Sequence, residues 1–212
     1  MLSKEFPSAE IVGVEPKPDN YGQCLKSATD RIKFIKKDCR NLRNAEMGTF
    51  DFVWCFGLIY HLEDPIPLMS SLVSITHSQS LICIDGHIAI DGEQTYSPSP
   101  SSPIRKTLSD GCEYYGKVYQ GLPEDSSETE RDKFDRASLD NPWSFWLTYE
   151  SILDLFRRSG FCQIVEIRCD LAQSLFGPGL ILPSVDPDRE WSRRLFVLSR
   201  ETILTNSLSS SV

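Results

Sequence analysis

The chain alternates short apolar runs with amphipathic stretches over its first 90 residues. Short apolar runs rich in β-branched and aromatic side chains are typical of strands buried in a parallel sheet. Four such runs predict strands: 10–15, 32–35, 50–56 and 81–90. Acidic residues close the first two runs, so we expect carboxylates at these strand ends.

Helix signals lie between and after these runs. Residues 19–29 predict a modest helix, and Asp64, followed by a proline, is a candidate N-cap for a helix that continues to His77. Later in the chain, Thr148 is a good N-cap, and apolar residues share one face of the helix that it begins. Gly160 is placed to end that helix.

The predicted order is β-α-β-β-α-β, an insertion, and then α-β-β. Strands that alternate with helices indicate an α/β fold with a mostly parallel sheet. The last two strands, 162–169 and 193–200, have no helical pattern between them and predict an antiparallel hairpin at one edge. We expect half of one domain at 1–90, a flexible insertion or lid at 91–140, the other half at 141–204 and a disordered tail at 205–212.

Composition is that of a globular protein of one domain, with 212 residues and a mass of 24.1 kDa. There are 22 Lys and Arg against 30 Asp and Glu, and the formal charge of −8 argues against a protein that coats nucleic acid with its whole surface. Seven cysteines without a C-x-x-C pair indicate buried thiols in a reducing compartment and no metal site. We find neither a secretory signal nor a membrane span and expect a cytoplasmic protein.

Candidate ligand-binding residues stand at the predicted strand ends, because ligands of doubly wound sheets lie outside the carboxyl ends of the strands. Glu15 ends the first strand, where a carboxylate can accept hydrogen bonds from both hydroxyls of a ribose. Asp38 and Cys39 follow the second strand, where a carboxylate and the next backbone N–H can pair with an adenine. The alternatives are a solvated acid at the strand end for Glu15 and a loop or cap residue for Asp38. A nicotinamide site also uses such an acid, but the sequence has no G-x-G-x-x-G motif.

The loop after the third strand holds further candidates. Gly57 would let a ligand approach the backbone closely, and Tyr60 and His61 follow on the rim. A free histidine has a pKa near 6.5, which suits a proton acceptor, so His61 is the first candidate for a base. A hydrogen-bonded structural imidazole is the alternative. His87 follows the fourth strand and is a second histidine that can face the cleft.

Two surface features and one aromatic cluster allow more than one interpretation. Residues 91–113 are dominated by Ser, Pro and Gly and predict a flexible excursion. Basic residues are concentrated in the segment 26–43. They can bind an RNA backbone or form a solvated face. Six aromatic residues can cover a flat substrate, stack on a base, or form a satellite core: Tyr114, Tyr115, Tyr119, Trp143, Phe145 and Trp146.

In their order and spacing, these motifs resemble the class I S-adenosylmethionine-dependent methyltransferases. VGVEP resembles the acidic loop after that family's second strand, and FIKKDCRNL the Asp-containing loop after its third. FDFVWCFGLIYHLEDP resembles the fourth strand with its loop, and WLTYESILDLFRRSGF the helix before the last two strands. The resemblance covers residues 9–90 and 141–200. Within the family, YHLEDP and the WSFW-LT block are most similar to the branch of tRNA wobble-uridine (carboxy)methyltransferases.

The resemblance implies a Rossmann-like methyltransferase sheet, S-adenosylmethionine as the cofactor, no metal, and a small molecule or tRNA as the methyl acceptor. It implies that Glu15 holds the ribose and that Asp38, with Cys39, holds the adenine. Phe56 and Gly57 would lie beside the methionine moiety or the transferring methyl group. The candidates for substrate contact and catalysis are Tyr60 and His61.

The chain departs from the family pattern at its start. The family's first strand and Gly-rich loop precede the position of VGVEP, and that strand lies between the second and fourth strands of the sheet. Here only MLSKEFPSA stands before the first apolar run. We therefore expect a sheet that lacks its first strand, as in a truncated protein. The two functional hypotheses are a methyltransferase impaired by this truncation and a non-catalytic methyltransferase-like binding module or relic.

Overall fold

The computed structural model describes residues 8–90, 101–121, 123, 126–127, 142–167 and 193–201. The expected tail at 205–212 lies outside these described residues, as does most of the expected insertion between 124 and 140. The elements in chain order are β1 (Ile11–Val14), α2 (Pro18–Cys24), η1 (Leu25–Ser27), β2 (Ile32–Ile35), η2 (Cys39–Asn41), α3 (Asn44–Met47), β3 (Phe50–Cys55), η3 (Ile59–His61), α4 (Ile66–Ser74), β4 (Thr76–His87), β5 (Ile104–Thr107), β6 (Glu113–Gln120), β7 (Trp143–Leu147), α6 (Tyr149–Arg158), β8 (Gln163–Ile167) and β9 (Arg193–Ser199).

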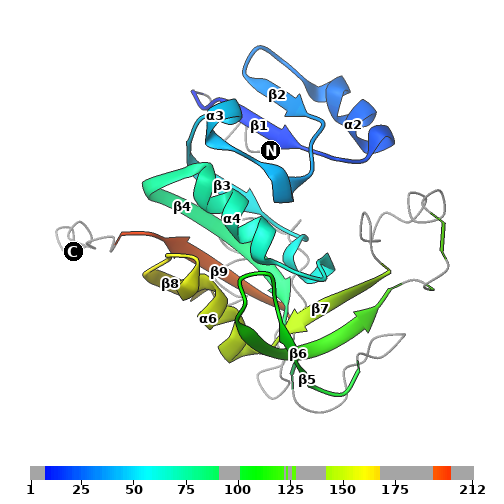
Figure 1. Ribbon diagram of the computed structural model, residues 1–212. Coiled ribbons are helices and arrows are strands. Elements are labelled where there is room, and N and C mark those ends of the chain that lie inside the picture. The colour runs from blue at the N-terminus through cyan, green and yellow to red at the C-terminus, as the bar shows by residue number, and fades with distance from the viewer. Residues whose placement is uncertain are drawn as a thin grey trace, which may run out of the picture.

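The strands form three sheets (Figure 1). β1 and β2 pair in parallel, and a four-stranded sheet has the order β3-β4-β9-β8. In that sheet β3 and β4 are parallel, whereas β9 runs antiparallel to both of its neighbours. The predicted α/β fold and the antiparallel edge hairpin are thereby confirmed. The predicted parallel pairing is confirmed in part, for β1 with β2 and β3 with β4.

The junction between the first two sheets has an unusual feature. The two-stranded sheet lies on the β3 side of the larger sheet, in line with it (Figure 1). Within the described residues, no ladder of backbone hydrogen bonds joins β1 to β3. This is the junction at which the sequence analysis expects a strand to be lacking.

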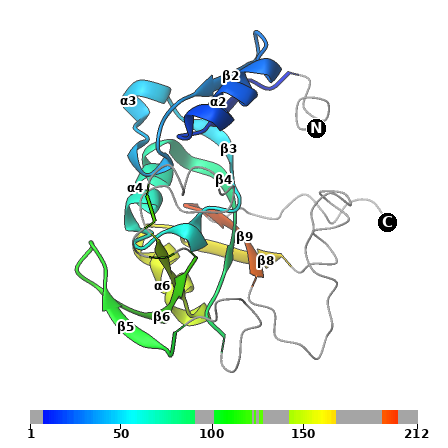
Figure 2. The ribbon, with the colours of Figure 1, turned by 90° about the vertical axis from the view of Figure 1, so that its right-hand side faces the viewer.

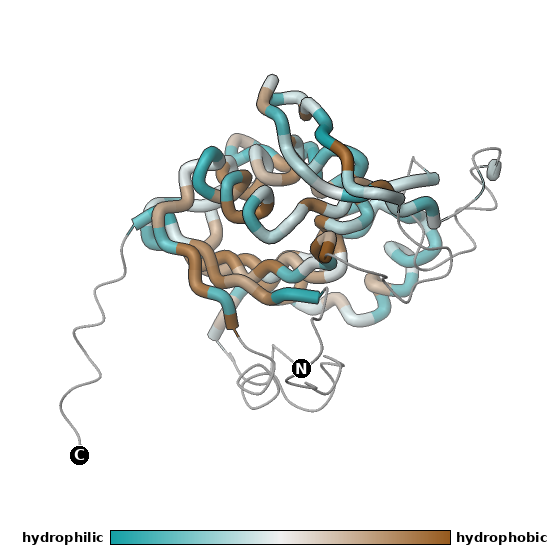
Figure 3. The backbone as a smooth tube through the Cα atoms, turned by 90° about the horizontal axis from the view of Figure 1, so that it is seen from below, coloured by the Kyte–Doolittle hydropathy of each residue, from teal (hydrophilic) through white to brown (hydrophobic). Residues whose placement is uncertain are grey.

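The core lies between the four-stranded sheet and two helices. α4 and α6 cover the same face of this sheet (Figure 2). Apolar residues accordingly concentrate in the strands and helices of the interior (Figure 3). The α6 residues Leu155 and Phe156 are fully buried, and the Phe156 ring meets Phe196 of β9 edge-on at 5.4 Å. Thr148 caps α6 as predicted, because its hydroxyl accepts a hydrogen bond from the Ser151 backbone N–H.

The start and end of α4 differ from the prediction. Pro65, not Asp64, is the N-cap residue, although the Asp64 carboxylate still accepts a hydrogen bond of 2.8 Å from the Ile66 backbone. The helix ends at Ser74, and β4 begins two residues later. His77 therefore lies in a strand and pairs with Asp51 at 3.0 Å, because the strand begins earlier than its apolar run suggests.

The prediction of a flexible excursion over 91–113 is wrong for two parts of this range. Residues 104–107 form β5, and residue 113 begins β6. These strands and β7 make an antiparallel sheet of order β5-β6-β7. The pairing is long-range, since β7 lies more than 20 residues after β6, so the local excess of Ser and Pro did not reveal it. Residues 91–100 lie outside the described part of the chain.

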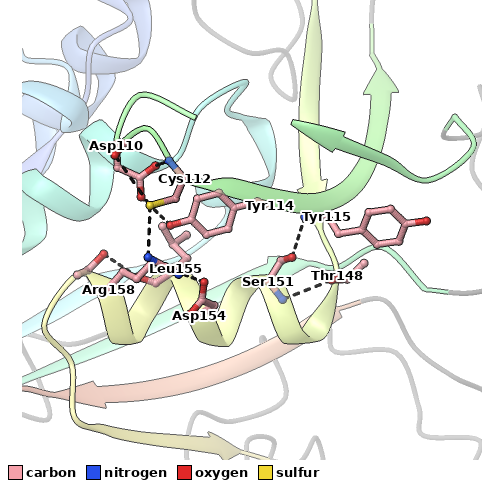
Figure 4. A network of polar contacts seen from close by, with 10 residues as sticks. Asp110, Cys112, Tyr114, Tyr115, Thr148, Ser151, Asp154, Leu155 and Arg158 are labelled. Carbon is pink, nitrogen blue, oxygen red and sulfur yellow. Dashed lines mark hydrogen bonds and ion pairs between the residues drawn. The ribbon is translucent and has the colours of Figure 1, made fainter. Parts of the chain in front are cut away.

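Polar contacts fix this second antiparallel sheet to α6 (Figure 4). The Tyr115 backbone N–H donates to the Ser151 hydroxyl at 2.8 Å, and the Tyr115 carbonyl accepts from the Thr148 N–H at 2.9 Å. At the far end of the helix, the Arg158 guanidinium donates to the Cys112 sulfur at 3.3 Å. The sheet is therefore attached along the length of α6.

Candidate functional site

The loops that follow β1, β2 and β3 lie close together. The charge of Lys17, after β1, acts on His61, after β3. Cys39, after β2, packs against the main core and interacts electrostatically with Cys55 at the end of β3. These interactions relate the loop after β1 to the loop after β3, and Cys39 to the end of β3, while a shared binding site at these strand ends stays a prediction.

Glu15 lies at the end of β1 and is half-buried. Its backbone N–H donates to the Ile35 carbonyl at 3.1 Å, which extends the β1–β2 ladder by one residue. Its carboxylate accepts a hydrogen bond of 2.8 Å from the Lys17 N–H, which precedes α2. The turn thus holds the carboxylate at the strand end, where a diol could reach it.

Asp38 begins η2 and is held by Arg40. The carboxylate accepts from the Arg40 backbone N–H at 2.8 Å and from the guanidinium Nε at 3.0 and 3.1 Å. Burial alone would raise the pKa of Asp38, but the hydrogen bonds and charge of Arg40 outweigh it and lower the pKa. Burial and the Asp38 charge raise the pKa of the Cys39 thiol to about 11. Asp38 is thus an anionic acceptor, and Cys39 a neutral thiol.

Gly57 opens the loop after β3 with a φ of 72°, in the left-handed region that favours glycine. Its N–H donates a hydrogen bond of 2.6 Å to Asp85 on β4. A Cβ at Gly57 would lie 3.8 Å from the Tyr60 hydroxyl, so Tyr60 folds back toward the glycine. Phe56 stacks at an angle against Trp54, with 4.4 Å between the ring centroids.

Asp85 is a further residue of this site that was not among the candidates from the sequence, and it is only 1% exposed. Its second carboxylate oxygen accepts from Arg193 of β9, at 2.7 Å from Nε. The signal was present in the sequence, because Asp85 is an acid inside the apolar run LICIDGHIAI. Buried acids are rare unless they are paired, so such a residue marks a specific interaction.

The loop ends in a cluster of aromatic and imidazole rings. Tyr60 lies 4.4 Å from His61 and meets His87 edge-on at 4.6 Å, measured between ring centroids. Trp146 stacks on His87 at 4.9 Å and on Tyr119 at 4.7 Å. Below the cluster, a small hollow beside Tyr60 and His87 has room for about one water molecule.

Both histidines of this cluster favour the neutral form. Burial and the Lys17 charge lower the pKa of His61 to about 4. Burial and the charges of Arg193 and His61 lower the pKa of His87 to about 4. The imidazoles are therefore neutral at pH 7.

The other sequence candidates divide among several places. Trp146 and Tyr119 join the ring cluster, whereas Tyr114 and Phe145 belong to the main core and not to a satellite core. Tyr115 is 45% exposed. In the basic segment, Lys37 pairs with Glu46 and Arg40 with Asp38, while Lys26, Lys33 and Lys36 are exposed.

The described part of the chain has neither a candidate metal site nor a candidate membrane span. No group of three His, Cys, Asp or Glu side chains there could hold a metal ion. No helix in the same residues is long and apolar enough to cross a membrane. The six described cysteines are free thiols.

Known proteins share this sequence pattern. A family model for a methyltransferase domain matches residues 1–84. A tRNA U34 carboxymethyltransferase of Campylobacter jejuni subsp. doylei is 25% identical over 155 residues, which are 65% of this chain and 53% of that protein. The protein of the same name from Campylobacter concisus is 27% identical over 126 residues, or 51% of this chain and 40% of that one. The chain thus spans about half the length of the curated relatives it matches.

Solved structures share the fold. The N-terminal domain of EvdMO1 with SAH bound has a TM-score of 0.57 at 19% identity, over 91% of this chain and 66% of that chain. An S-adenosylmethionine-dependent methyltransferase from Mesorhizobium loti has a TM-score of 0.55 at 14% identity, over 94% and 84%. The chain has the class I S-adenosylmethionine-dependent methyltransferase fold. In this methyltransferase fold, the loops that carry Glu15, Asp38 and Gly57 are the ones that the family resemblance assigns to the cofactor.

Proposed function

We propose that the chain binds S-adenosylmethionine at the ends of β1, β2 and β3 and transfers its methyl group. The observation that carries the proposal is the proximity of the three strand-end loops, seen in the electrostatic effect of Lys17 on His61 and of Cys39 on Cys55. The methyltransferase family match over residues 1–84 supports it, because this segment contains all three loops.

The residues present fit such a cofactor by their chemistry. Glu15 offers a half-buried carboxylate for the ribose hydroxyls, and Asp38 is an anionic acceptor for the adenine amine. An adenine at Asp38 would share its carboxylate with Arg40. Gly57 presents its backbone beside Phe56 without a Cβ, which leaves room for the methionine moiety.

The cofactor supplies an activated methyl group on a sulfonium, and the protein must orient the acceptor and exclude water. We propose that Tyr60 contacts the acceptor and that neutral His61 takes up the proton that the acceptor atom releases. A pKa of about 4 makes His61 a weak base. A general base works best when its pKa lies near the pH at which the enzyme operates. Because the pKa of His61 lies well below 7, this histidine suits an acceptor group that ionises readily.

The acceptor is proposed to be a small molecule or a tRNA. The net charge of −8 favours a small molecule. The names of the Campylobacter relatives and the exposed Lys26, Lys33 and Lys36 favour a tRNA. The second functional candidate, a non-catalytic binding module, is favoured by the unpaired junction between β1 and β3 in the described residues.

Calorimetry with S-adenosylhomocysteine tests the proposal. The full chain is expected to bind, and Glu15→Ala is expected to weaken binding at least about tenfold through the loss of the ribose contact. Glu10→Ala, which removes an exposed glutamate next to β1, is the matched control and should leave the affinity unchanged. Equal affinity of the Glu15→Ala variant and the wild type would reject the site.

A second arm separates the two functional candidates. If the chain alone does not bind, a version extended before Met1 by a strand and a Gly-rich loop is measured in the same way. Binding by the extended chain supports a methyltransferase that needs this segment. The absence of binding by both forms supports the non-catalytic module.

A further inference from the structure

Asp85 connects three strands of the four-stranded sheet. Its side chain is almost fully buried, with one oxygen on the Gly57 N–H of the loop after β3 and the other on the Arg193 guanidinium of β9. A buried carboxylate is costly unless its oxygens are hydrogen-bonded to charged or polar donors. Both oxygens have such donors here, so this carboxylate is specifically accommodated.

The two bonds need a carboxylate, and a neutral amide cannot replace it fully. An asparagine can accept from the Gly57 N–H through its oxygen, but its NH₂ group would then face the Arg193 donors. Gly57 has only one backbone donor, and it points at Asp85 from a left-handed conformation. The carboxylate therefore fixes the direction in which the loop leaves β3.

The next two residues of β4 hold the rest of the same loop. Gly86 is needed for space, because a Cβ there would lie 2.5 Å from a methyl group of Ile59. The His87 ring meets the Tyr60 ring edge-on. Three consecutive residues of β4 thus contact the loop at its start, middle and end.

We propose that Asp85, anchored by Arg193, is a positioning residue for the loop Gly57–His61 and sets the affinity of the chain for the cofactor. Its effect on the cofactor passes through Gly57, and this part rests on the proposed function. Its effect on the loop is independent of any ligand. The family resemblance assigns no role to this residue.

Hydrogen–deuterium exchange of the full chain tests the effect on the loop. Asp85→Asn is expected to raise the exchange rate of the Gly57–His61 amides at least about tenfold and to leave the α6 amides unchanged. The matched control is Glu166→Gln, which removes a carboxylate paired with the neighbouring Arg194 at 3.1 Å. This control should leave the loop amides unchanged. Wild-type exchange in Asp85→Asn, or equal acceleration throughout the chain, would overturn the proposal.

A second variant keeps the test independent of overall stability. Arg193→Met added to Asp85→Asn removes the donor that would oppose the amide, so the loop amides should regain part of their protection. If the double variant exchanges faster than the single one, the carboxylate–arginine pair has only a stabilising role and the proposal fails.

Titration with S-adenosylhomocysteine tests the consequence for the cofactor. Asp85→Asn is expected to bind about tenfold more weakly than the wild type, and Glu166→Gln within about twofold of it. Equal affinities in the presence of altered exchange would overturn the link to the cofactor. A wild-type chain that does not bind would reject the proposed function instead, and the exchange result would still decide the role of Asp85.

Discussion

The indole nitrogen of Trp146 donates a hydrogen bond of 2.9 Å to the main-chain oxygen of Tyr60, which lies 86 residues earlier. One residue before Trp146, the Phe145 N–H donates to the Leu62 carbonyl at 2.9 Å. Strand β7 therefore holds the candidate loop in addition to Asp85. β5 and β6 of the antiparallel sheet fall in the expected insertion 91–140, and β7 of the same sheet supports the site.

Trp146→Phe should destabilise the fold by about 1 kcal/mol, because it removes this hydrogen bond while keeping a ring in the stack. Trp143→Phe, on the same strand, is the control. Its ring contacts the Lys106 ammonium at 4.3 Å, and a phenylalanine retains a ring there. Urea denaturation measures both variants, and a smaller loss in Trp146→Phe than in Trp143→Phe would contradict the prediction.

Gly57→Ala should destabilise the fold by about 1–2 kcal/mol, because Gly57 has a positive φ that an alanine adopts only with strain. Gly22→Ala in α2 has nothing within 4 Å of the new Cβ and should be neutral or stabilise by up to about 1 kcal/mol. Thermal unfolding of both variants checks the difference, and the prediction fails if both move the midpoint in the same direction.

The free energy of unfolding should fall as the pH drops from 7 to 5. The folded chain holds His61 and His87 at a pKa of about 4, whereas the unfolded value is near 6.5. Between these values the unfolded chain binds protons that the folded chain does not, so acid favours unfolding, by about 2 kcal/mol per histidine at pH 5. Above pH 7 both histidines are neutral in the folded and the unfolded chain, so they no longer change the free energy of unfolding with pH.

The double variant His61→Gln and His87→Gln checks the origin of this pH dependence. Urea denaturation at pH 7 and pH 5 should show a smaller difference in the double variant than in the wild type. An unchanged difference would assign the acid sensitivity to other groups.

Thr148→Ala should cost about 1 kcal/mol, because the first turn of α6 loses the hydroxyl that accepts from the Ser151 N–H. Thr148→Ser keeps that acceptor and should stay within about 0.5 kcal/mol of the wild type. Circular dichroism during thermal unfolding follows both variants. Equal losses in the two would show that the methyl group, and not the cap, stabilises the helix.

Local patterns predicted much of the parallel half of the fold. The run at 32–35 and the capping residue Thr148 were placed correctly, because apolar periodicity and capping are encoded within a few residues. Glu15 and Asp38 could be placed at strand ends for the same reason. Their role in binding stays a prediction.

Long-range pairing could not be predicted in this way. β6 and β7 pair although they lie far apart in the sequence, and neither has a local pattern that predicts a strand. The environment of His61 was also hidden, because its pKa depends on burial and on Lys17, which is 44 residues away in sequence. Asp85 was missed although it is an acid within an apolar run. Its role depends on the pairing with Arg193, which lies 108 residues later and which no local pattern reveals.

The lack of a backbone ladder between β1 and β3 within the described residues makes 11–35 a separate opening unit. Hydrogen bonds to α4 tether the chain just after this unit, from the Leu42 N–H to Ser71 and from the Asn44 N–H to Ser74. Units held by few shared bonds unfold locally before the rest of a domain. S-adenosylmethionine bound by both Glu15 and Gly57 would therefore link the two halves, and part of its binding free energy would appear as stabilisation of the opening unit against local unfolding.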